Sequence, residues 1–335
     1  MKAVKIGTPA SVDNLQLVDI DDPGQPGPGQ VRVRIHASSL NFHDYGVVSG
    51  VLPADAGRIP MADGAGVVEA VGEGVGEFKA GDHVVSCFFP SWENGTPTIG
   101  DFKTTPGDGI DGYAREVVVL PSHYFTHAPK GYSHAEAATL TTAGLTAWRA
   151  LIVDGQLKPG ATVLVLGTGG VSIFGLQLAK AMGASVIATS SSDAKLEKLR
   201  ALGADHTINY RENPEWGKTV RSLTGGRGVD HVIEVGGPGT LPQSITACRI
   251  GGHIALIGVL TGRAGPVPTA ALMARQQRLQ GLIVGSRQDQ RDMTRALEVT
   301  GIKPVIDSTF ELAKLGDAFR HEAAGAHFGK ICVSI

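Results

Sequence analysis

The chain has 335 residues, enough for about two domains of ordinary size. Its 42% hydrophobic and 19% charged residues are typical of an ordered globular protein. The net charge of −2 argues against nucleic-acid or anionic-membrane partners, and no apolar run approaches the ~20 residues that span a bilayer. The cysteines Cys87, Cys248 and Cys332 lie far apart, and residues 1–6 lack the apolar core of a signal peptide, so we expect a cytoplasmic protein.

Residues 1–128 predict a β-rich domain. Residues 31–37 alternate apolar and polar side chains, as a half-buried strand does. Shorter β-like runs follow at 66–71, 83–87 and 114–119, with glycines between the first two. These features favour a small, bent, barrel-like sheet. The Gly/Pro/Thr-rich segment 88–111 is predicted to be a long loop, either functional or loosely ordered.

Residues 129–286 predict an α/β domain. An apolar run at 162–166 precedes a helical pattern from Val171 to Met182, and a second strand and helix follow at 185–189 and 194–202. Further strand-like runs occur at 230–235, 253–258 and 282–285. Strands that alternate with helices are typical of a parallel, doubly wound sheet. The remaining residues, 287–335, end in a strand-like run at 330–335.

A glycine-rich turn lies between the first apolar strand and its helix. Gly167, Gly169, Gly170 and Val171 match a dinucleotide-binding fingerprint, in which the turn and the helix N-terminus face the pyrophosphate. Ser172 replaces the third glycine of the GxGxxG pattern. A structural turn is the alternative, but the register of strand, helix and second strand favours a dinucleotide site.

The end of the second strand predicts which cofactor binds. An NAD enzyme places a carboxylate there for the ribose hydroxyls, whereas this chain offers Ser190, Ser191 and, slightly later, Lys195. Hydroxyls and an ammonium group would hold a 2′-phosphate, so we predict NADP(H). Asp193 could take the acidic role instead. Helix capping by Ser192 or Asp193 and a solvated Lys195 are the structural alternatives.

Motifs along the whole chain resemble the zinc-independent, quinone oxidoreductase-like branch of the medium-chain dehydrogenase/reductase superfamily. They lie at residues 39–44, 64–72, 79–82, 143–148, 166–172, 202–205, 208–210 and 327–330. The resemblance implies a GroES-like catalytic domain at 1–128 that the tail 287–335 completes. It also implies a Rossmann NADP-binding domain at 129–286 and a nicotinamide site in a cleft between the domains.

The resemblance also assigns cofactor contacts. It places Tyr210 near the adenosine phosphate and Lys330 against the pyrophosphate. Without the resemblance, Tyr210 would be interpreted as a buried tyrosine and Lys330 as a solvated lysine. The glycines named in the next sentence would be interpreted as turn residues. The remaining predicted cofactor contacts are Thr142, Gly236, Gly237, Ile257, Gly258, Val259, Gly285 and Ser286.

The positions that hold catalytic zinc in the superfamily's alcohol dehydrogenases correspond here to Asn41, Ala62 with Asp63, and Thr139. Zinc prefers thiolate, imidazole or carboxylate ligands, which an amide, a methyl and a hydroxyl do not supply. The loop 88–111 contains no cysteine for a structural zinc. We therefore predict no metal.

Without zinc, the easier reaction is hydride addition to an α,β-unsaturated carbonyl or a quinone, whose developing charge is delocalised. We predict that Asn41 and Asp44 organise the substrate pocket. His43 and Tyr45 are candidate proton donors, although such residues are more often simply packed. A zinc-free alcohol or aldehyde oxidoreductase and a non-catalytic NADPH-binding protein are the alternatives. The apolar segment 282–284 resembles strands that pair across dimers, so we expect a homodimer.

Overall fold

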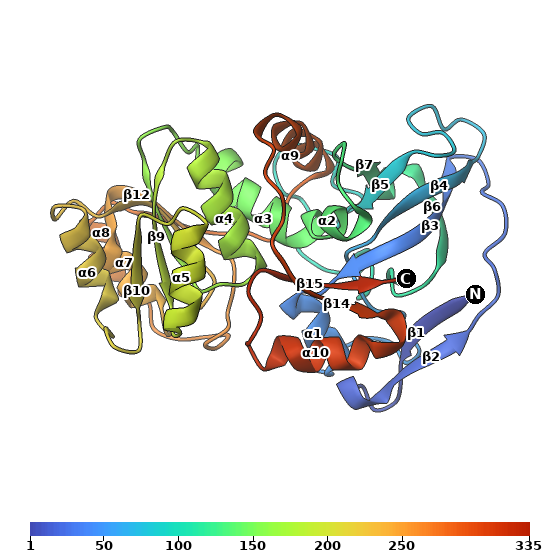
Figure 1. The fold of residues 1–335 in the computed structure, drawn as a ribbon, viewed down its shortest axis with the longest axis horizontal. Helices are drawn as coiled ribbons and strands as arrows, with labels where there is room; N and C mark the ends of the chain where they lie inside the picture. Colours follow the sequence, from blue (N-terminus) through green and yellow to red (C-terminus); the bar gives the residue numbers. More distant parts are fainter. The chain divides into compact units, whose positions relative to one another are not determined.

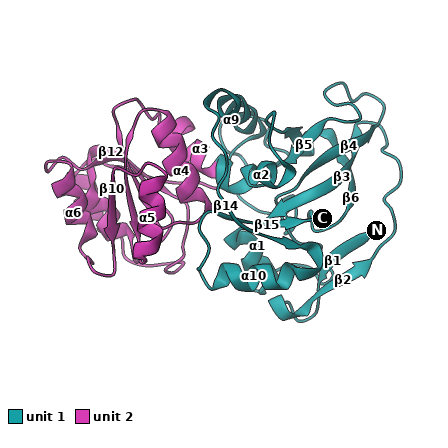
Figure 2. Cartoon of the chain, viewed as in Figure 1, with its two compact units in different colours: residues 1–145, 284–335 teal, residues 146–283 magenta.

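The computed structural model describes all residues from 1 to 335, in two compact units (Figure 2). Unit 1 comprises Met1–Leu145 and Val284–Ile335, and unit 2 comprises Thr146–Ile283. The structure thus divides the chain later than the predicted boundary at residue 128. The reason is that helix α2 (His134–Ala138) packs against strands of the unit 1 sheet.

A mainly antiparallel sheet of seven strands forms the centre of unit 1. The order is β14-β15-β3-β4-β5-β7, and β6 also pairs with β3. The strands are β3 (Gln30–Ser39), β4 (Ala65–Val71), β5 (His83–Ser86), β6 (Val117–Pro121), β7 (Phe125–His127), β14 (Ile306–Glu311) and β15 (Lys330–Ser334). Cys332 lies opposite Ser39, so the C-terminal strand completes the sheet of the N-terminal segment.

A separate antiparallel pair, β1 (Lys2–Ile6) and β2 (Leu15–Asp19), packs in the same unit. The other helices of this unit are α1 (Phe42–Val48), α9 (Arg287–Thr300) and α10 (Leu315–Ala323), with π-helical residues at Leu140–Gly144. Phe319 of α10 and Val47 of α1 are buried in one apolar cluster with Val4 of β1. This core fixes α1, which carries the predicted site residues Asn41 and Asp44 at its N-terminus.

Unit 2 is a parallel sheet of six strands in the order β10-β9-β8-β11-β12-β13. The strands are β8 (Thr162–Leu166), β9 (Ser185–Ser190), β10 (His206–Asn209), β11 (Val229–Glu234), β12 (Cys248–Leu256) and β13 (Arg278–Gly281). In chain order this is 3-2-1-4-5-6, the arrangement of dinucleotide-binding domains. The predicted doubly wound sheet is therefore confirmed.

Helices flank this parallel sheet, as Figure 1 shows. Helices α4 and α5 pack against β8, β9 and β10, and α7 packs against β11 and β12 with α6 beside it. Their bounds are α4 (Gly170–Ala181), α5 (Asp193–Ala201), α6 (Trp216–Leu223), α7 (Leu241–Ala247) and α8 (Thr269–Ala274), and a short α3 (Leu145–Trp148) spans the unit boundary. None of the helices is long and apolar enough to cross a membrane.

One predicted strand is wrong. The apolar run 282–285 lies beyond the last strand of the parallel sheet, which is β13 (Arg278–Gly281). Val284 has a φ of 46°, a left-handed backbone conformation that a strand does not adopt. β13 pairs only with β12, so this edge strand does not need the continuous apolar sequence of a central one.

Candidate active site and cofactor site

The glycine turn of unit 2 presents an open helix N-terminus. Gly167 has a φ of 74°, and Gly169 is the N-cap of α4 with no side-chain cap. A Cβ atom at either glycine would meet nothing within 4 Å. The backbone hydrogen bond from Ile173 N to Gly169 O begins the helix, so the amides before Ile173 face the open end. This arrangement fits a pyrophosphate.

Ser172 accounts for the missing third glycine of the fingerprint. Its hydroxyl is buried and donates a hydrogen bond of 2.6 Å to the carbonyl oxygen of Leu166 at the end of β8. The side chain therefore ties the first turn of α4 to the strand without occupying the open N-terminus.

The residues predicted to choose the cofactor lie at the ends of β9 and β10. Tyr210 N donates to Ser190 O at 3.1 Å, so these two predicted contacts are neighbours. Tyr210 is 41% exposed, and Ser191 and Lys195 are half-buried. The Asp193 carboxylate accepts a hydrogen bond of 2.9 Å from the Asn209 side chain, which ties this acid to the next strand.

Glu234 organises the third part of the predicted cofactor site, and the sequence analysis missed it. Its fully buried carboxylate accepts hydrogen bonds from Gly236 N at 2.8 Å and Gly237 N at 3.0 Å. Its backbone oxygen accepts from Ile257 N at 2.8 Å and Gly258 N at 3.3 Å. One residue thus holds the turns after β11 and β12 side by side. The signal in the sequence was a glutamate inside an apolar run, directly before two glycines.

The predicted contacts of unit 2 therefore gather at the carboxyl ends of adjacent parallel strands, where dinucleotides bind in this fold. Gly285 and Ser286 belong to unit 1 instead. There, Ser286 is the N-cap of α9, and its hydroxyl donates to Asp289 Oδ2 at 2.7 Å. All of these assignments stay predictions.

Asp63 is the centre of a buried polar cluster in unit 1. Its side chain is fully buried and accepts hydrogen bonds from Ser39 Oγ at 2.5 Å, Asn41 Nδ2 at 2.9 Å and Thr142 Oγ1 at 2.6 Å. Lys330 Nζ lies 3.8 Å from Asp63 Oδ2. The cluster brings together Asn41, Thr142 and Lys330, three of the predicted site residues that lie far apart in the sequence.

The amide of Asn41 is engaged within this cluster. Nδ2 donates to Asp63 and also to Asp44 Oδ2 at 3.0 Å, while Oδ1 accepts from Lys330 Nζ at 2.6 Å. Both amide hydrogens thus go to carboxylates. We therefore expect Asn41 to position its neighbours rather than to donate a hydrogen bond to a substrate. Lys330 is 4% exposed and also donates to Leu40 O, so a pyrophosphate contact by Lys330 stays a prediction that the structure does not display.

Around Asp63, the carboxyl groups of Asp44, Asp63 and Glu322 outnumber the single ammonium group of Lys330. Burial, and then the charge of Asp63, raise the pKa of Asp44 to about 6. Burial raises the pKa of Glu322 to about 8, although Lys330 opposes the shift. Glu322 Oε2 is buried without a hydrogen-bond partner. Glu322, which the sequence analysis did not identify, therefore retains a proton at neutral pH and relieves the excess negative charge.

The positions that correspond to zinc ligands carry little that would hold zinc. Ala62 has no donor atom, and Thr139 Oγ1 donates to Glu136 O at 2.7 Å. Asp63 is the one carboxylate among them, and three hydrogen bonds already satisfy it. No group of three or more His, Cys, Asp or Glu side chains is arranged to hold a metal ion. The donor set therefore does not fit a catalytic zinc.

The two candidate proton donors lie in different surroundings. The ring of Tyr45 packs against Phe42 and Phe319, with centroids 6.5 and 6.4 Å away, at the edge of the apolar cluster. His43 Nε2 lies 3.2 Å from Asp108 Oδ2. Tyr45 thus has a packing role, whereas His43 faces a carboxylate.

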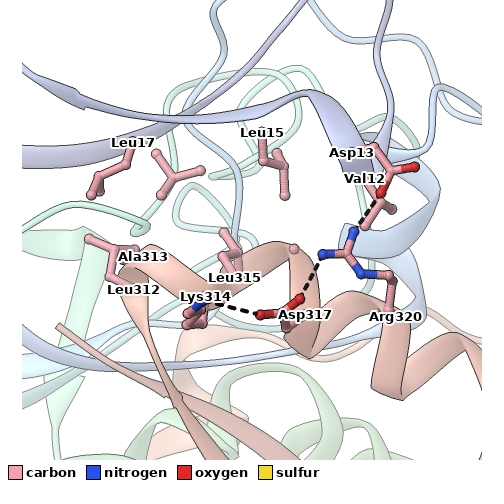
Figure 3. Close-up of a pocket in the computed structure, with 12 residues that line it drawn as sticks. Val12, Asp13, Leu15, Leu17, Leu312, Ala313, Lys314, Leu315, Asp317 and Arg320 are labelled. Carbon is pink, nitrogen blue, oxygen red and sulfur yellow. Dashed lines mark hydrogen bonds and ion pairs between the residues drawn. The ribbon is translucent and has the colours of Figure 1, made fainter.

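A pocket of about 300 Å³ lies elsewhere in unit 1, between the β1–β2 pair and α10 (Figure 3). Its charged side chains pair with one another, since Arg320 contacts both Asp13 and Asp317. It contains none of the predicted site residues.

A β-rich unit that the C-terminal strands complete, together with a parallel sheet that offers an open glycine turn, is the architecture of nicotinamide-dependent dehydrogenases and reductases. Family models agree with this assignment. Residues 27–130 match the alcohol dehydrogenase GroES-like domain, and residues 170–300 match the zinc-binding dehydrogenase model.

Individual relatives match the whole chain. A zinc-type alcohol dehydrogenase-like protein of Schizosaccharomyces pombe is 43% identical over 96% of both chains. A putative alcohol dehydrogenase from Sinorhizobium meliloti is 41% identical, with a TM-score of 0.92 over 100% of this chain and 99% of that one. The chain belongs to the medium-chain dehydrogenase/reductase family of alcohol dehydrogenase-like oxidoreductases.

Solved structures with more specific names are also similar. One described as an NAD-dependent alcohol dehydrogenase is 36% identical, with a TM-score of 0.90 over 100% of both chains. A quinone oxidoreductase from Pseudomonas syringae is 30% identical, with a TM-score of 0.83 over 100% of this chain and 99% of that one. The protein is thus an oxidoreductase of a family that uses a nicotinamide cofactor and small-molecule substrates.

Proposed function

We propose that the protein is an NADPH-dependent, zinc-independent reductase of activated carbonyl acceptors, namely α,β-unsaturated carbonyls or quinones. The observation that carries this proposal is the cluster around Asp63. Where zinc-dependent relatives place metal ligands, this chain has an amide, a methyl and a hydroxyl, and its one carboxylate there is satisfied by three hydrogen bonds.

The cofactor, when bound, supplies a hydride at its nicotinamide ring. The open N-terminus of α4 would hold the pyrophosphate, and Ser190, Ser191 and Lys195 would hold the 2′-phosphate. Buried Glu234 fixes the turns at Gly236 and Gly258, which would line the nicotinamide side. Asp63, through Asn41 and Thr142, holds the polar edge of unit 1 in one geometry, so that the substrate meets preorganised groups.

The lack of suitable metal ligands favours conjugated acceptors. A simple ketone places the full developing charge on one oxygen, which a metal ion would normally stabilise. An enone or quinone spreads that charge over an enolate or phenolate, which hydrogen bonds and water can stabilise. The quinone oxidoreductase of P. syringae among the similar structures supports this choice.

A zinc-free alcohol or aldehyde oxidoreductase is the second candidate, because relatives more similar to this chain are named alcohol dehydrogenases. A panel of acceptors separates the two. We expect NADPH consumption with enones and quinones to exceed that with saturated ketones, and NADP⁺ reduction with simple alcohols to be slow. Faster alcohol oxidation would favour the second candidate. Turnover with neither class would leave a non-catalytic, cofactor-binding role.

We further propose a cytoplasmic homodimer. The three cysteines are buried and unpaired, which suits a reducing compartment. β13 pairs with β12 on one side only and so forms an edge of the sheet, and Ile283, two residues after this strand, is 45% exposed. Light scattering during size-exclusion chromatography tests the proposal, since a dimer has twice the chain mass of 34.8 kDa.

A further inference from the structure

His43 and Asp108 form a pair next to the Asp63 cluster. His43 Nε2 lies 3.2 Å from Asp108 Oδ2, and the two side chains are only 17% and 12% exposed. His43 lies on α1, two residues after Asn41, whereas Asp108 comes from the long irregular segment 88–111. The function proposed above leaves this pair without a role.

The segment 88–111 is built to hold this position. At Gly107, with a φ of 85°, a Cβ atom would lie 2.6 Å from Met61 N, so only glycine permits this close approach to the backbone before Asp63. Tyr113 N donates to Met61 O at 2.9 Å, and Asp111 Oδ1 accepts from Ile59 N at 3.1 Å. The loop is therefore anchored on the segment that carries Asp63, and Asp108 follows directly after the closest contact.

Aromatic rings fix the imidazole. The His43 ring lies 4.6 Å from the Phe102 ring and 5.4 Å from the Phe88 ring, measured between centroids. Phe88 is 2% exposed. Both rings belong to the same loop segment, so the loop supplies the walls as well as the carboxylate that face His43.

The two ring nitrogens of His43 differ. Nε2 is buried and has no hydrogen-bond partner. A carboxylate oxygen of Asp108 lies 3.2 Å from it. The His43 side chain as a whole is 17% exposed. An imidazole with one nitrogen against a carboxylate can hold a proton and pass it to a bound molecule through its other nitrogen.

We propose that His43 is the proton donor of the reductase, and that Asp108 positions the His43 ring. This inference rests on the proposed reduction of conjugated acceptors. It also gives the loop 88–111 a function, because the loop delivers Asp108 and the aromatic walls.

Hydride from the reduced nicotinamide forms a C–H bond at the β-carbon of the enone, so NADPH is oxidised to NADP⁺ and the enone is reduced to an enolate. The enolate electron pair then takes the proton from Nδ1 of the His43 imidazolium, which forms a C–H bond at the α-carbon. His43 becomes neutral and regains a proton from water. The charged groups that face it are Asp108 from the loop and Asp44 from its own helix.

The first test is reduction of 2-methyl-2-cyclohexenone by wild type and His43→Gln. Removing a general acid typically costs 10²–10⁴-fold in rate, so we expect kcat to fall by at least ~10²-fold. NADPH affinity and the unfolding midpoint should not change. Protonation at the α-carbon creates a stereocentre, and we expect one enantiomer from wild type and a mixture from the variant, because water then protonates either face.

His321→Gln is the matched control. His321 Nε2 also pairs with an aspartate of unit 1, at 2.9 Å from Asp307 Oδ2, but this pair lies on α10 and β14. We expect its rate and product to match wild type. Unchanged rate and enantiomer ratio in His43→Gln, in an enzyme that does prefer enones, would overturn this inference alone. A wild type that reduces no conjugated acceptor would overturn the proposed function as well.

A binding measurement tests the pair without turnover. 4-Nitrophenolate resembles the charged enolate, so the NADP⁺-loaded wild type should bind it at least ~10-fold more tightly than His43→Gln does. Asp108→Asn should weaken phenolate binding, and Asp108→Glu should restore part of it. Equal phenolate affinity in all of these variants would contradict the proposal.

Discussion

Lys330 Nζ donates a hydrogen bond of 2.6 Å to Asn41 Oδ1, although 289 positions separate the two residues. The contact joins the last strand of the chain to the N-terminus of α1. Both residues also lie against Asp63, so one buried ammonium group faces several carboxyls.

The first prediction follows from this contact. Lys330→Met removes the only ammonium near Asp63 and leaves this buried carboxylate without a counter-charge, which typically costs 3–5 kcal/mol. We expect the free energy of unfolding, measured with urea, to fall by about that amount. Lys2→Met is the control, because the Lys2–Asp19 pair is 51% and 75% exposed and its loss should change the free energy of unfolding far less. Equal effects of the two changes would contradict our reading of the cluster.

Local features of the fold could be predicted from the sequence, whereas contacts between distant residues could not. The glycine turn at Gly167 and the strands around it could be predicted from hydrophobic periodicity, because the pattern of apolar residues in a strand shows which of its side chains are buried. The hydrogen bond from Gly236 N to the Glu234 carboxylate joins residues only two positions apart. It could still not be predicted, because a glutamate in an apolar run does not indicate which amides donate to it.

The contacts of Lys330 with Asn41 and of Asp108 with His43 depend on the tertiary fold. No spacing in the sequence encodes them. The predicted strand at 282–285 failed for a related reason. Leu282 and Val284 are apolar and buried, but they lie outside the strand. The strand itself is the more polar segment Arg278–Gly281 at the edge of the sheet.

The second prediction concerns cofactor preference. Titration with NADPH and NADH should show at least ~10-fold tighter binding of NADPH, because each hydrogen bond to a charged phosphate contributes about 1.5–3 kcal/mol. Lys195→Ala should narrow this difference. Lys198→Ala, on the same helix, should preserve it. Equal affinity of the wild type for both cofactors would show that Ser190, Ser191 and Lys195 do not bind a 2′-phosphate.

The third prediction concerns metal content. Because the Asp63 carboxylate is satisfied by Ser39, Asn41 and Thr142, we expect purified protein to contain far less than one zinc per chain. Elemental analysis measures this content directly, and treatment with a chelator should leave the rate of reduction unchanged. Stoichiometric zinc whose removal abolishes turnover would refute the assignment.

The fourth prediction concerns acid stability. Burial lowers the pKa of both His231 and His253 to about 4, whereas an unfolded histidine titrates near 6.5. Between these values the unfolded chain binds protons that the folded chain does not, so stability is full above pH ~6.5 and falls as the pH drops toward ~4.

Urea unfolding at several pH values between ~4 and ~7 measures this loss. His231→Leu should reduce it by on the order of 3 kcal/mol, since one pKa unit corresponds to about 1.4 kcal/mol. The same substitution at the exposed His206 serves as the control. A variant that loses as much stability in acid as wild type would contradict the role of His231.

The central claim is that this oxidoreductase acts on conjugated acceptors without a metal. The most direct measurement is the ratio of kcat/KM for 2-cyclohexenone to that for cyclohexanone, with NADPH and with chelator-treated protein. The two substrates differ only in the conjugated double bond, so the ratio isolates the benefit of delocalising the incoming charge. We predict a ratio of at least ~10², equivalent to about 2.7 kcal/mol of transition-state stabilisation. A ratio near or below one, or activity that returns only when zinc is added, would contradict the account.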